Sequence, residues 1–134
     1  MKKFLAFAIS LIAIVACAFA VACGSKSPVT ADENTVFITA DKSYNNKTLL
    51  EYMNHLQDEG DLTFEIKDGM VTSINGKSNT TNSFWMLYTD DTENANEAWG
   101  TFEHEGKTYG SAVSGASDLK IKENCMYIWT YQTF

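Results

Sequence analysis

The run Phe84–Tyr88 (Phe-Trp-Met-Leu-Tyr) constrains the fold more than any other stretch of this chain. It is five apolar residues long and lies between two polar segments, Asn79–Ser83 and Thr89–Asn94. A short, aromatic-rich run between turn-forming residues predicts a strand that is buried on both faces. Near the end of the chain, Met126–Tyr131 alternates between two kinds of side chain, as a neighbouring strand does. We therefore expect a sheet that is built around these two strands.

The segment Thr48–Glu59 is the strongest helix candidate. Thr48 and Glu51 have the spacing of a capping box, in which each side chain accepts a hydrogen bond from the other residue's backbone amide. Gly60 can adopt the left-handed conformation that ends a helix. Apolar residues recur along one stripe at helical spacing, namely Leu49, Leu50, Met53 and Leu56. This pattern predicts one amphipathic helix that packs on the sheet.

Two further segments have the pattern of β-hairpins. Apolar and polar residues alternate in Leu62–Lys67, and Met70–Ile74 forms the return strand after Asp68-Gly69, a pair that favours a type I′ turn. A second hairpin is expected over Trp99–Tyr109. Together these elements predict the α+β class, as a single small domain with one main helix packed on a mixed sheet and an added β-hairpin.

The N-terminal segment has the features of a lipoprotein signal peptide. Two lysines precede the apolar run Phe4–Ala22, as in secretory signals. The sequence Ala20-Val21-Ala22-Cys23 resembles the lipobox of bacterial lipoproteins, whose cysteine thiol receives a diacylglycerol and becomes the first residue after cleavage. We therefore expect a signal peptide over residues 1–22, an acylated Cys23 with a flexible tether over 23–34, and a folded domain over 35–134.

Two alternatives to this N-terminal assignment remain. Cys17 also follows a lipobox-like sequence, but acylation there would leave Ala18–Ala22 at the mature start, whereas Cys23 leads directly into a polar segment. The 19 residues of Phe4–Ala22 are also just long enough to be an uncleaved transmembrane anchor. Acylation at Cys23 is the favoured interpretation. Since two acyl chains, such as palmitate, are enough for stable anchoring, we expect a location on the extracytoplasmic face of the cell membrane.

The charge of the predicted mature chain restricts its partners. Without Lys2 and Lys3, eight of the chain's 10 basic residues remain against 17 acidic residues, so the formal charge is −9. No arginine is present. Such a surface repels nucleic acids and anionic lipids. We therefore expect no nucleic-acid partner, and membrane attachment through acyl chains alone.

The sequence offers little to support catalysis or metal binding. It has no Ser–His–Asp arrangement, no phosphate-binding glycine loop and no Cys–His spacing of a zinc site. The acidic segment Asp90–Asn94 lacks the ligand spacing of a calcium loop. Cys125 is expected to be a small turn or strand residue, and His104 a surface residue. We expect a non-catalytic protein with no metal and no cofactor.

The order of these elements resembles a known family. Thr35–Thr39 is a leading strand, the predicted helix follows, and the hairpin ends in Ser73-Ile74-Asn75-Gly76 before the Phe84–Tyr88 and Met126–Tyr131 strands. This order resembles the domain-of-unknown-function family related to the C-terminal domain of transcobalamin and intrinsic factor, one of the soluble-ligand-binding β-grasp groups. The likeness covers about Thr35–Tyr131. It departs from the family in two loops, at Thr89-Asp90-Asp91 and at Asn124-Cys125.

The resemblance implies a small-molecule ligand, with cobalamin or another corrinoid as the first candidate. The ligand is expected at loops on one end of the sheet, within Thr89–Trp99 and Gly110–Ser117. The candidate binding residues are Trp99, Asp90, Asp91, Ser111, Ser114 and Gly115. Trp99 would offer a flat aromatic face to the ligand, or would instead hold its own loop against the core. The alternative function is a cell-envelope module that binds a protein partner or has a structural role, without a small-molecule ligand.

Overall fold

The computed structural model describes residues 27–134. The predicted signal peptide, Cys23 and the first part of the predicted tether lie outside these residues. Of the described residues, 48% lie in strands and 12% in helices, so the domain is α+β with a strong excess of β-structure. A short 3₁₀-helix, η1 (Lys42–Tyr44), leads from the second strand towards the α-helix. None of the described helices has the length and apolar character needed to cross a membrane.

Six strands form the main sheet, in the spatial order β1-β2-β9-β6-β8-β7. The predicted strands at Phe84–Tyr88 and Met126–Tyr131 are confirmed as β6 and β9, which pair along their whole length at the middle of this sheet. The six strands are β1 (Val29–Ala31), β2 (Thr35–Thr39), β6 (Ser83–Thr89), β7 (Ala95–His104), β8 (Lys107–Ala112) and β9 (Met126–Thr133).

All neighbouring strands of the main sheet are antiparallel, so the predicted mixed sheet is wrong. The reason lies in the position of β9. Because β9 pairs antiparallel with both β2 and β6, these two strands run in the same direction. A direct β2–β6 contact would have made a parallel pair, but β9 lies between them. The last strand of the chain therefore decides the sheet type.

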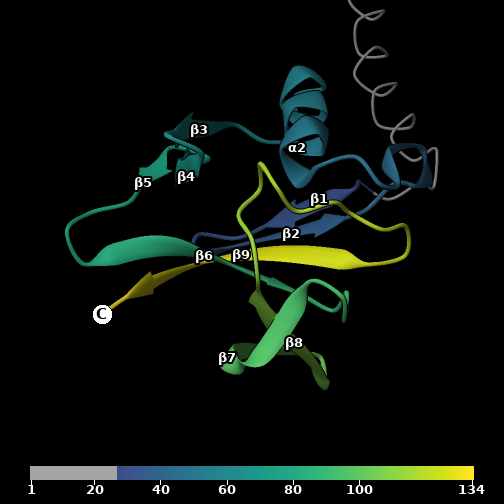
Figure 1. Ribbon diagram of the computed structural model, residues 1–134. Helices are drawn as coiled ribbons and strands as arrows, with labels where there is room; N and C mark the ends of the chain where they lie inside the picture. Colours follow the sequence, from purple (N-terminus) through teal and green to yellow (C-terminus); the bar gives the residue numbers. More distant parts are fainter. Residues whose placement is uncertain (1–26) are drawn as a thin grey trace, which may run out of the picture.

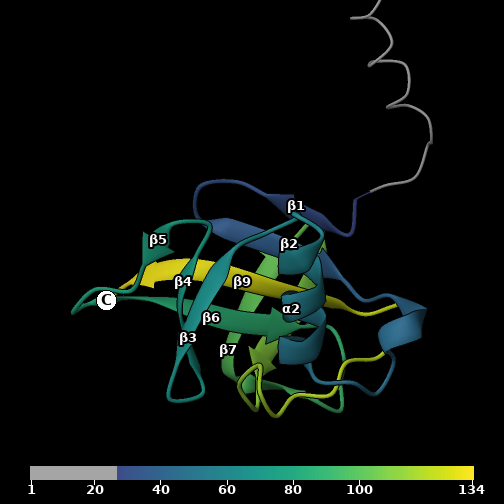
Figure 2. The ribbon, with the colours of Figure 1, turned by 90° about the horizontal axis from the view of Figure 1, so that it is seen from above.

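A helix and a small second sheet cover one face of the main sheet (Figures 1 and 2). The helix α2 (Leu49–Asp58) has Thr48 as its N-cap, and the Thr48 hydroxyl accepts a hydrogen bond from the Glu51 amide at 3.1 Å. Gly60 has a φ of 85°, as expected for the residue that ends the helix. The helix prediction is confirmed.

The second sheet contains the predicted first hairpin. Its three strands are β3 (Phe64–Lys67), β4 (Met70–Ile74) and β5 (Lys77–Ser78). Asp68 and Gly69 both have positive φ, as a type I′ turn requires, so this hairpin is confirmed. The second predicted hairpin is also confirmed, as β7 and β8. Its first strand begins at Ala95, before the predicted start at Trp99.

The predicted tether extends too far into the domain. We expected a flexible segment through Asn34, but Val29–Ala31 forms the edge strand β1, which pairs with β2. The sequence predicted a tether because Pro28 and the polar residues around it suggest irregular structure. Val29 is nevertheless buried in the core, and its burial holds this segment on the sheet.

The two faces of the main sheet differ in how completely they are covered. Under the helix and the second sheet, a continuous core includes Trp85, Leu87, Tyr127 and Trp129. The other face has a smaller cluster that includes Tyr88, Tyr109 and Ile128, next to the β7–β8 hairpin, which Figure 1 shows below β6 and β9. Phe84 lies beyond this cover and is exposed, so β6 is not buried on both faces along its whole length.

Residues 27–134 contain both sheets, the helix and a continuous hydrophobic core. Domains of this size bury enough apolar surface to be stable without disulfides or metal ions. The segment therefore has what it needs to fold as a unit by itself, and it can be studied without the N-terminal residues.

Candidate functional site

A cavity of about 340 Å³ lies where the second sheet meets the main sheet. We call it the Trp129 cavity. Its walls come from the β3–β4 turn with the start of β4, from β6 and β9, and from the segment that leaves β8. The lining residues are Gly69, Met70, Val71, Trp85, Met86, Leu87, Ser111, Ala112, Val113, Ser114, Gly115, Ala116 and Trp129. The volume falls at the lower end of the range for small-molecule sites.

The segment after β8 can form one wall because its residues are small. A Cβ atom built on Gly115 would lie 3.8 Å from the carbonyl oxygen of Gly69, and one built on Gly69 would lie 3.7 Å from the Ser117 hydroxyl. The two backbones therefore approach closely and close one side of the cavity. The sequence predicted such an approach for Gly110–Ser117, and the partner is the β3–β4 turn.

The cavity has an uncharged lining, in which polar and apolar atoms expose similar areas, and it is open to the surface. None of its lining residues carries an ionisable side chain. Ser111 and Ser114 contribute hydroxyl groups to a wall that is otherwise mostly aromatic and aliphatic. Met70 is 60% exposed and Val113 is 42% exposed, so these two side chains form a rim that is open to solvent. Small organic ligands bind in concave sites that combine apolar surface with a few polar groups.

One polar atom of a lining residue has no hydrogen-bond partner among residues 27–134. Trp129 is only 4% exposed, and its Nε1 is a buried donor without a hydrogen bond to any described residue. More than nine in ten buried polar groups in proteins are paired, so each exception needs an explanation. Because this nitrogen is closed off from solvent, Trp129 lines the cavity with its other atoms.

The other tryptophan on this face of the sheet, Trp85, has a hydrogen-bond acceptor for its indole N–H. Trp85 and Trp129 both lie on the face covered by the second sheet, and both line the cavity. The Nε1 of Trp85 donates to the carbonyl oxygen of Lys77 at 2.8 Å. The residues paired with Trp129 on the two neighbouring strands are Val36 and Leu87, whose side chains offer no acceptor. The difference is therefore local to Trp129.

Asp91, one of the predicted ligand residues, is bound within the protein. It is 4% exposed, and its carboxylate accepts hydrogen bonds from the Glu93 amide at 3.1 Å and from the Asn94 side chain at 2.7 Å. The Tyr127 hydroxyl donates to it at 3.3 Å. Burial, more than the nearby Asp91 charge, raises the pKa of Tyr127 above its usual value. Asp91 organises its loop and is not available to a ligand there.

Asp90 is engaged in the same way. One of its oxygens accepts from the Met126 amide at 2.9 Å, and the other binds the Lys107 ammonium at 2.6 Å. That hydrogen bond raises the pKa of Lys107. Burial, followed by the charges of Asp90 and Asp91, raises the pKa of the neighbouring Cys125 thiol, which disfavours a reactive thiolate.

Trp99 does not contribute to the Trp129 cavity, and it does not lie in a loop as we predicted. It belongs to β7, within an irregularity of the β7–β8 pairing between Asn96 and Thr101. Its side chain is 64% exposed. This exposure also rejects the alternative, in which Trp99 holds its segment against the core. Of the six predicted binding residues, the cavity therefore brings together Ser111, Ser114 and Gly115, and it excludes Trp99, Asp90 and Asp91.

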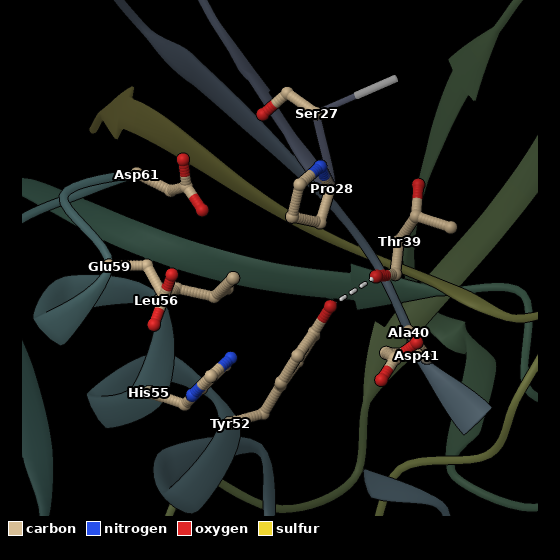
Figure 3. A pocket seen from close by; sticks show the side chains of 10 residues that line it. All are labelled: Ser27, Pro28, Thr39, Ala40, Asp41, Tyr52, His55, Leu56, Glu59 and Asp61. Carbon is tan, nitrogen blue, oxygen red and sulfur yellow. Dashed lines mark hydrogen bonds between the residues drawn. The ribbon is translucent and has the colours of Figure 1, made fainter. Parts of the chain in front are cut away.

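A second cavity, of about 530 Å³, lies between the end of α2 and the start of the main sheet (Figure 3). Its buried polar group is the Tyr52 hydroxyl, which donates to the Thr39 carbonyl oxygen at 2.9 Å. Burial, with smaller effects from Asp41 and Asp61, raises the pKa of Tyr52 to about 12. Among residues 27–134, no group of three or more acidic, histidine or cysteine side chains is arranged to hold a metal ion. The buried hydroxyl of Tyr52 in this cavity is thus already paired within the fold.

Sequence reasoning missed the sheet side of the site. Trp85 and Trp129 were interpreted as plain sheet core, and Gly69 and Met70 as parts of a hairpin. Strand periodicity places Trp85 and Trp129 on one face, but it does not tell that the second sheet leaves a gap above them. The small residues of Gly110–Ser117 were the one signal that pointed to this place.

Comparisons with protein-family models, with curated proteins and with solved structures found no match to this chain.

Proposed function

We propose that this protein is a non-catalytic lipoprotein that binds a small molecule in the Trp129 cavity. The observation that carries the proposal is an uncharged, surface-reaching cavity with two tryptophans, Trp85 and Trp129, in its wall. Apolar walls would supply most of the binding free energy, and the polar groups would orient the ligand.

The cellular location in this proposal comes from the sequence. Acylation of Cys23 would hold the domain on the extracytoplasmic face of the membrane, where a binding module meets solutes that arrive from outside. Cells grown with an alkyne-tagged fatty acid should label the wild-type protein but not Cys23→Ala. Label that persists in Cys23→Ala and disappears in Cys17→Ala would instead assign the lipid to Cys17.

A corrinoid remains a candidate ligand through the family resemblance, and the β-grasp relation remains a prediction with it. A corrin ring with its amide side chains is much larger than 340 Å³. It would therefore have to lie across the mouth of the cavity, over Met70 and Val113, and insert only one substituent. Smaller ligands would fit inside. Titration with cobinamide tests whether a corrinoid binds at the cavity. It is followed by tryptophan fluorescence, because Trp85 and Trp129 both line the cavity.

The alternative function, a module that binds a protein in the cell envelope, is favoured by one observation. Trp99 is a large aromatic residue that is mostly exposed on β7, and β7 is an edge strand of the main sheet. Exposed aromatic residues are enriched in protein interfaces, and an edge strand offers unpaired backbone groups. Crosslinking in intact cells from a photoreactive residue at position 99 would reveal such a partner.

The ligand-binding proposal is tested with a variant that narrows the cavity. Gly115 has no positive φ and no atom closer than 3.8 Å to its Cβ position, so Gly115→Leu should fold while its side chain reduces the space beside Gly69. We expect wild-type residues 27–134 to bind neutral aromatic fragments with dissociation constants of about 1 mM or below in calorimetry. Gly115→Leu should weaken them at least about tenfold.

The matched control is Trp99→Leu, which alters an exposed residue outside the cavity and should leave fragment binding unchanged. Equal binding by Gly115→Leu and the wild type would reject the Trp129 cavity as the site. A loss of binding in Trp99→Leu alone would move the site to the edge strand and favour the interaction module.

A further inference from the structure

The outer strand of the β7–β8 hairpin has backbone groups that no other strand of the domain uses. β7 is an edge of the main sheet and pairs only with β8. His104 and Lys107 close a two-residue turn, and pairs in an antiparallel ladder alternate between those that exchange hydrogen bonds and those that do not. The amides and carbonyls of Thr101 and Glu103 therefore point away from β8. No backbone group elsewhere among residues 27–134 bonds to them.

An exposed aromatic side chain lies on the same strand. Trp99 precedes Thr101 by two residues, is 64% exposed, and belongs to the stretch in which the pairing with β8 is irregular. Proteins commonly protect a free strand edge with lysine or cover it, but Ala95–His104 contains no lysine. Unpaired backbone groups beside a large exposed aromatic residue are what an added strand would use for affinity and for side-chain contacts.

The charge along β7 restricts what can pair with it. Glu97 and Glu103 are exposed, and neither forms an ion pair with a described residue. Lys107, on β8, is already bound to Asp90. The β7 edge of a second copy would bring carboxylates of both chains together, and like charges on neighbouring strands are destabilising. A strand with lysine or arginine side chains would instead place opposite charges side by side.

We propose that β7 binds an extended, cationic segment of a partner protein, which adds to the main sheet as a further strand. The backbone of the segment pairs with Thr101 and Glu103, its cationic side chains lie beside Glu97 and Glu103, and an apolar side chain packs on Trp99. This inference rests on the alternative function proposed above, for which it names the chemistry of the partner. It does not use the Trp129 cavity.

The experiment compares three peptides that have capped ends. The first, Thr-Lys-Val-Lys-Val-Thr, favours an extended backbone and is cationic. The second has glutamate in both lysine positions. The third keeps the lysines but has N-methyl groups on its central backbone nitrogens, so that it retains the charge and cannot donate hydrogen bonds to a strand. Each is titrated, up to about 5 mM at about 150 mM salt, into ¹⁵N-labelled residues 27–134.

We expect the lysine peptide to move the amide protons of Thr101 and Glu103 downfield, as new hydrogen bonds do. The amides of Phe102 and His104 should move less, because they already bond to β8. The indole signal of Trp99 should shift as well. The glutamate peptide should bind at least about tenfold more weakly, and the N-methylated peptide should not produce the alternating pattern.

Two charge-reversal variants test whether the edge itself is recognised. Glu103→Lys changes the charge at the edge, and Asp58→Lys makes the same change on α2, on the opposite side of the main sheet (Figure 1). Both positions are exposed. Glu103→Lys should reverse the preference for the lysine peptide over the glutamate peptide, and Asp58→Lys should keep it. Trp99→Ala should weaken binding of the lysine peptide by about 3–10-fold.

The outcomes separate this inference from the functions proposed above. Equal binding of the lysine and glutamate peptides would reject the cationic partner. The same shifts from the N-methylated peptide would reject strand pairing, and a change of preference in Asp58→Lys equal to that in Glu103→Lys would show that only net charge is recognised. If no β7 signal moves, the inference is overturned. The interaction module is then still tested by crosslinking from position 99, and the ligand-binding function by fragments at the Trp129 cavity.

Discussion

The acidic loop Asp90–Asn94 and the small-residue segment Gly110–Ala116 make an instructive comparison. Both were expected to contact the ligand. The acidic loop contains the candidate residues Asp90 and Asp91, and the small-residue segment contains Ser111, Ser114 and Gly115. In the acidic loop, the Asp90 and Asp91 carboxylates are already engaged by amides, an ammonium group and a tyrosine hydroxyl. In the small-residue segment, the side chains leave space above Trp129.

This difference shows that a segment with many polar groups is not for that reason a ligand-binding site. Carboxylates that already accept hydrogen bonds from other groups of the domain stabilise the fold, and binding a ligand would require breaking these bonds. A ligand gains most where the fold leaves apolar surface uncovered, because it then supplies contacts that the protein lacks. The predictions that follow compare these two regions, from the largest expected effect to the smallest.

Trp85→Ala should have the largest effect on stability. Its ring belongs to the core, forms an edge-on contact with Tyr131 at 5.2 Å between ring centres, and also lines the Trp129 cavity. Emptying such a site costs about 3–5 kcal/mol of unfolding free energy. Urea denaturation measures it. A midpoint close to that of the wild type would mean that this wall of the cavity is not part of the core.

Asp91→Ala should destabilise the protein by about 2–4 kcal/mol, because it leaves the buried Tyr127 hydroxyl and two loop donors without their acceptor. Fragment binding should be unaffected once the protein is folded. Chemical denaturation and calorimetry on the same sample check both statements. A variant that keeps its stability but loses ligand binding would reverse the roles that we assign to the two regions.

Two glycines of the small-residue segment should respond differently to alanine. At Gly110 a Cβ would lie 3.1 Å from atoms of Ala95 and Glu97, whereas at Gly115 the nearest atom is 3.8 Å away. We expect Gly110→Ala to lower the unfolding free energy by about 1–3 kcal/mol and Gly115→Ala to change it by less than about 0.5 kcal/mol. Thermal melts of the pair are sufficient. Equal melting temperatures would show that β7 can move away from Gly110.

Trp99→Ala should have the smallest effect. Its side chain is mostly exposed, so we expect a change within about 0.5 kcal/mol in either direction. Denaturation under the conditions used for Trp85→Ala gives a direct comparison of the two tryptophans. A loss comparable to that of Trp85→Ala would mean that Trp99 packs on the domain after all.

Local sequence signals predicted much of this fold. The Thr48 N-cap with Gly60, the Asp68-Gly69 turn, and the apolar runs of β6 and β9 each have a short-range physical cause; of the predicted capping box, the bond from the Glu51 amide to the Thr48 hydroxyl is present. What failed depends on distant parts of the chain. The antiparallel sheet follows from where β9 inserts, and the edge strand at Val29 follows from its pairing with β2.

Only one wall of the candidate site was predicted from the sequence, for the same reason. Small residues such as Gly115 signal a close approach wherever they occur, so the wall formed by the β8-following segment was found. Asp91 was misinterpreted because a sequence shows a carboxylate but not the donors that already occupy it. Trp129 was missed because an unpaired indole nitrogen depends on its neighbours, here Val36 and Leu87, which lie far from it in the sequence.

The central claim is that small molecules bind at the Trp129 cavity and not at the acidic loop. The most direct test maps the amide shifts of ¹⁵N-labelled residues 27–134 that a library of neutral fragments causes. We predict that the shifts cluster in Gly69–Val71 and Ser111–Ala116, which line the cavity. Shifts confined to Asp90–Asn94 and Trp99, with the cavity signals unmoved, would contradict the account.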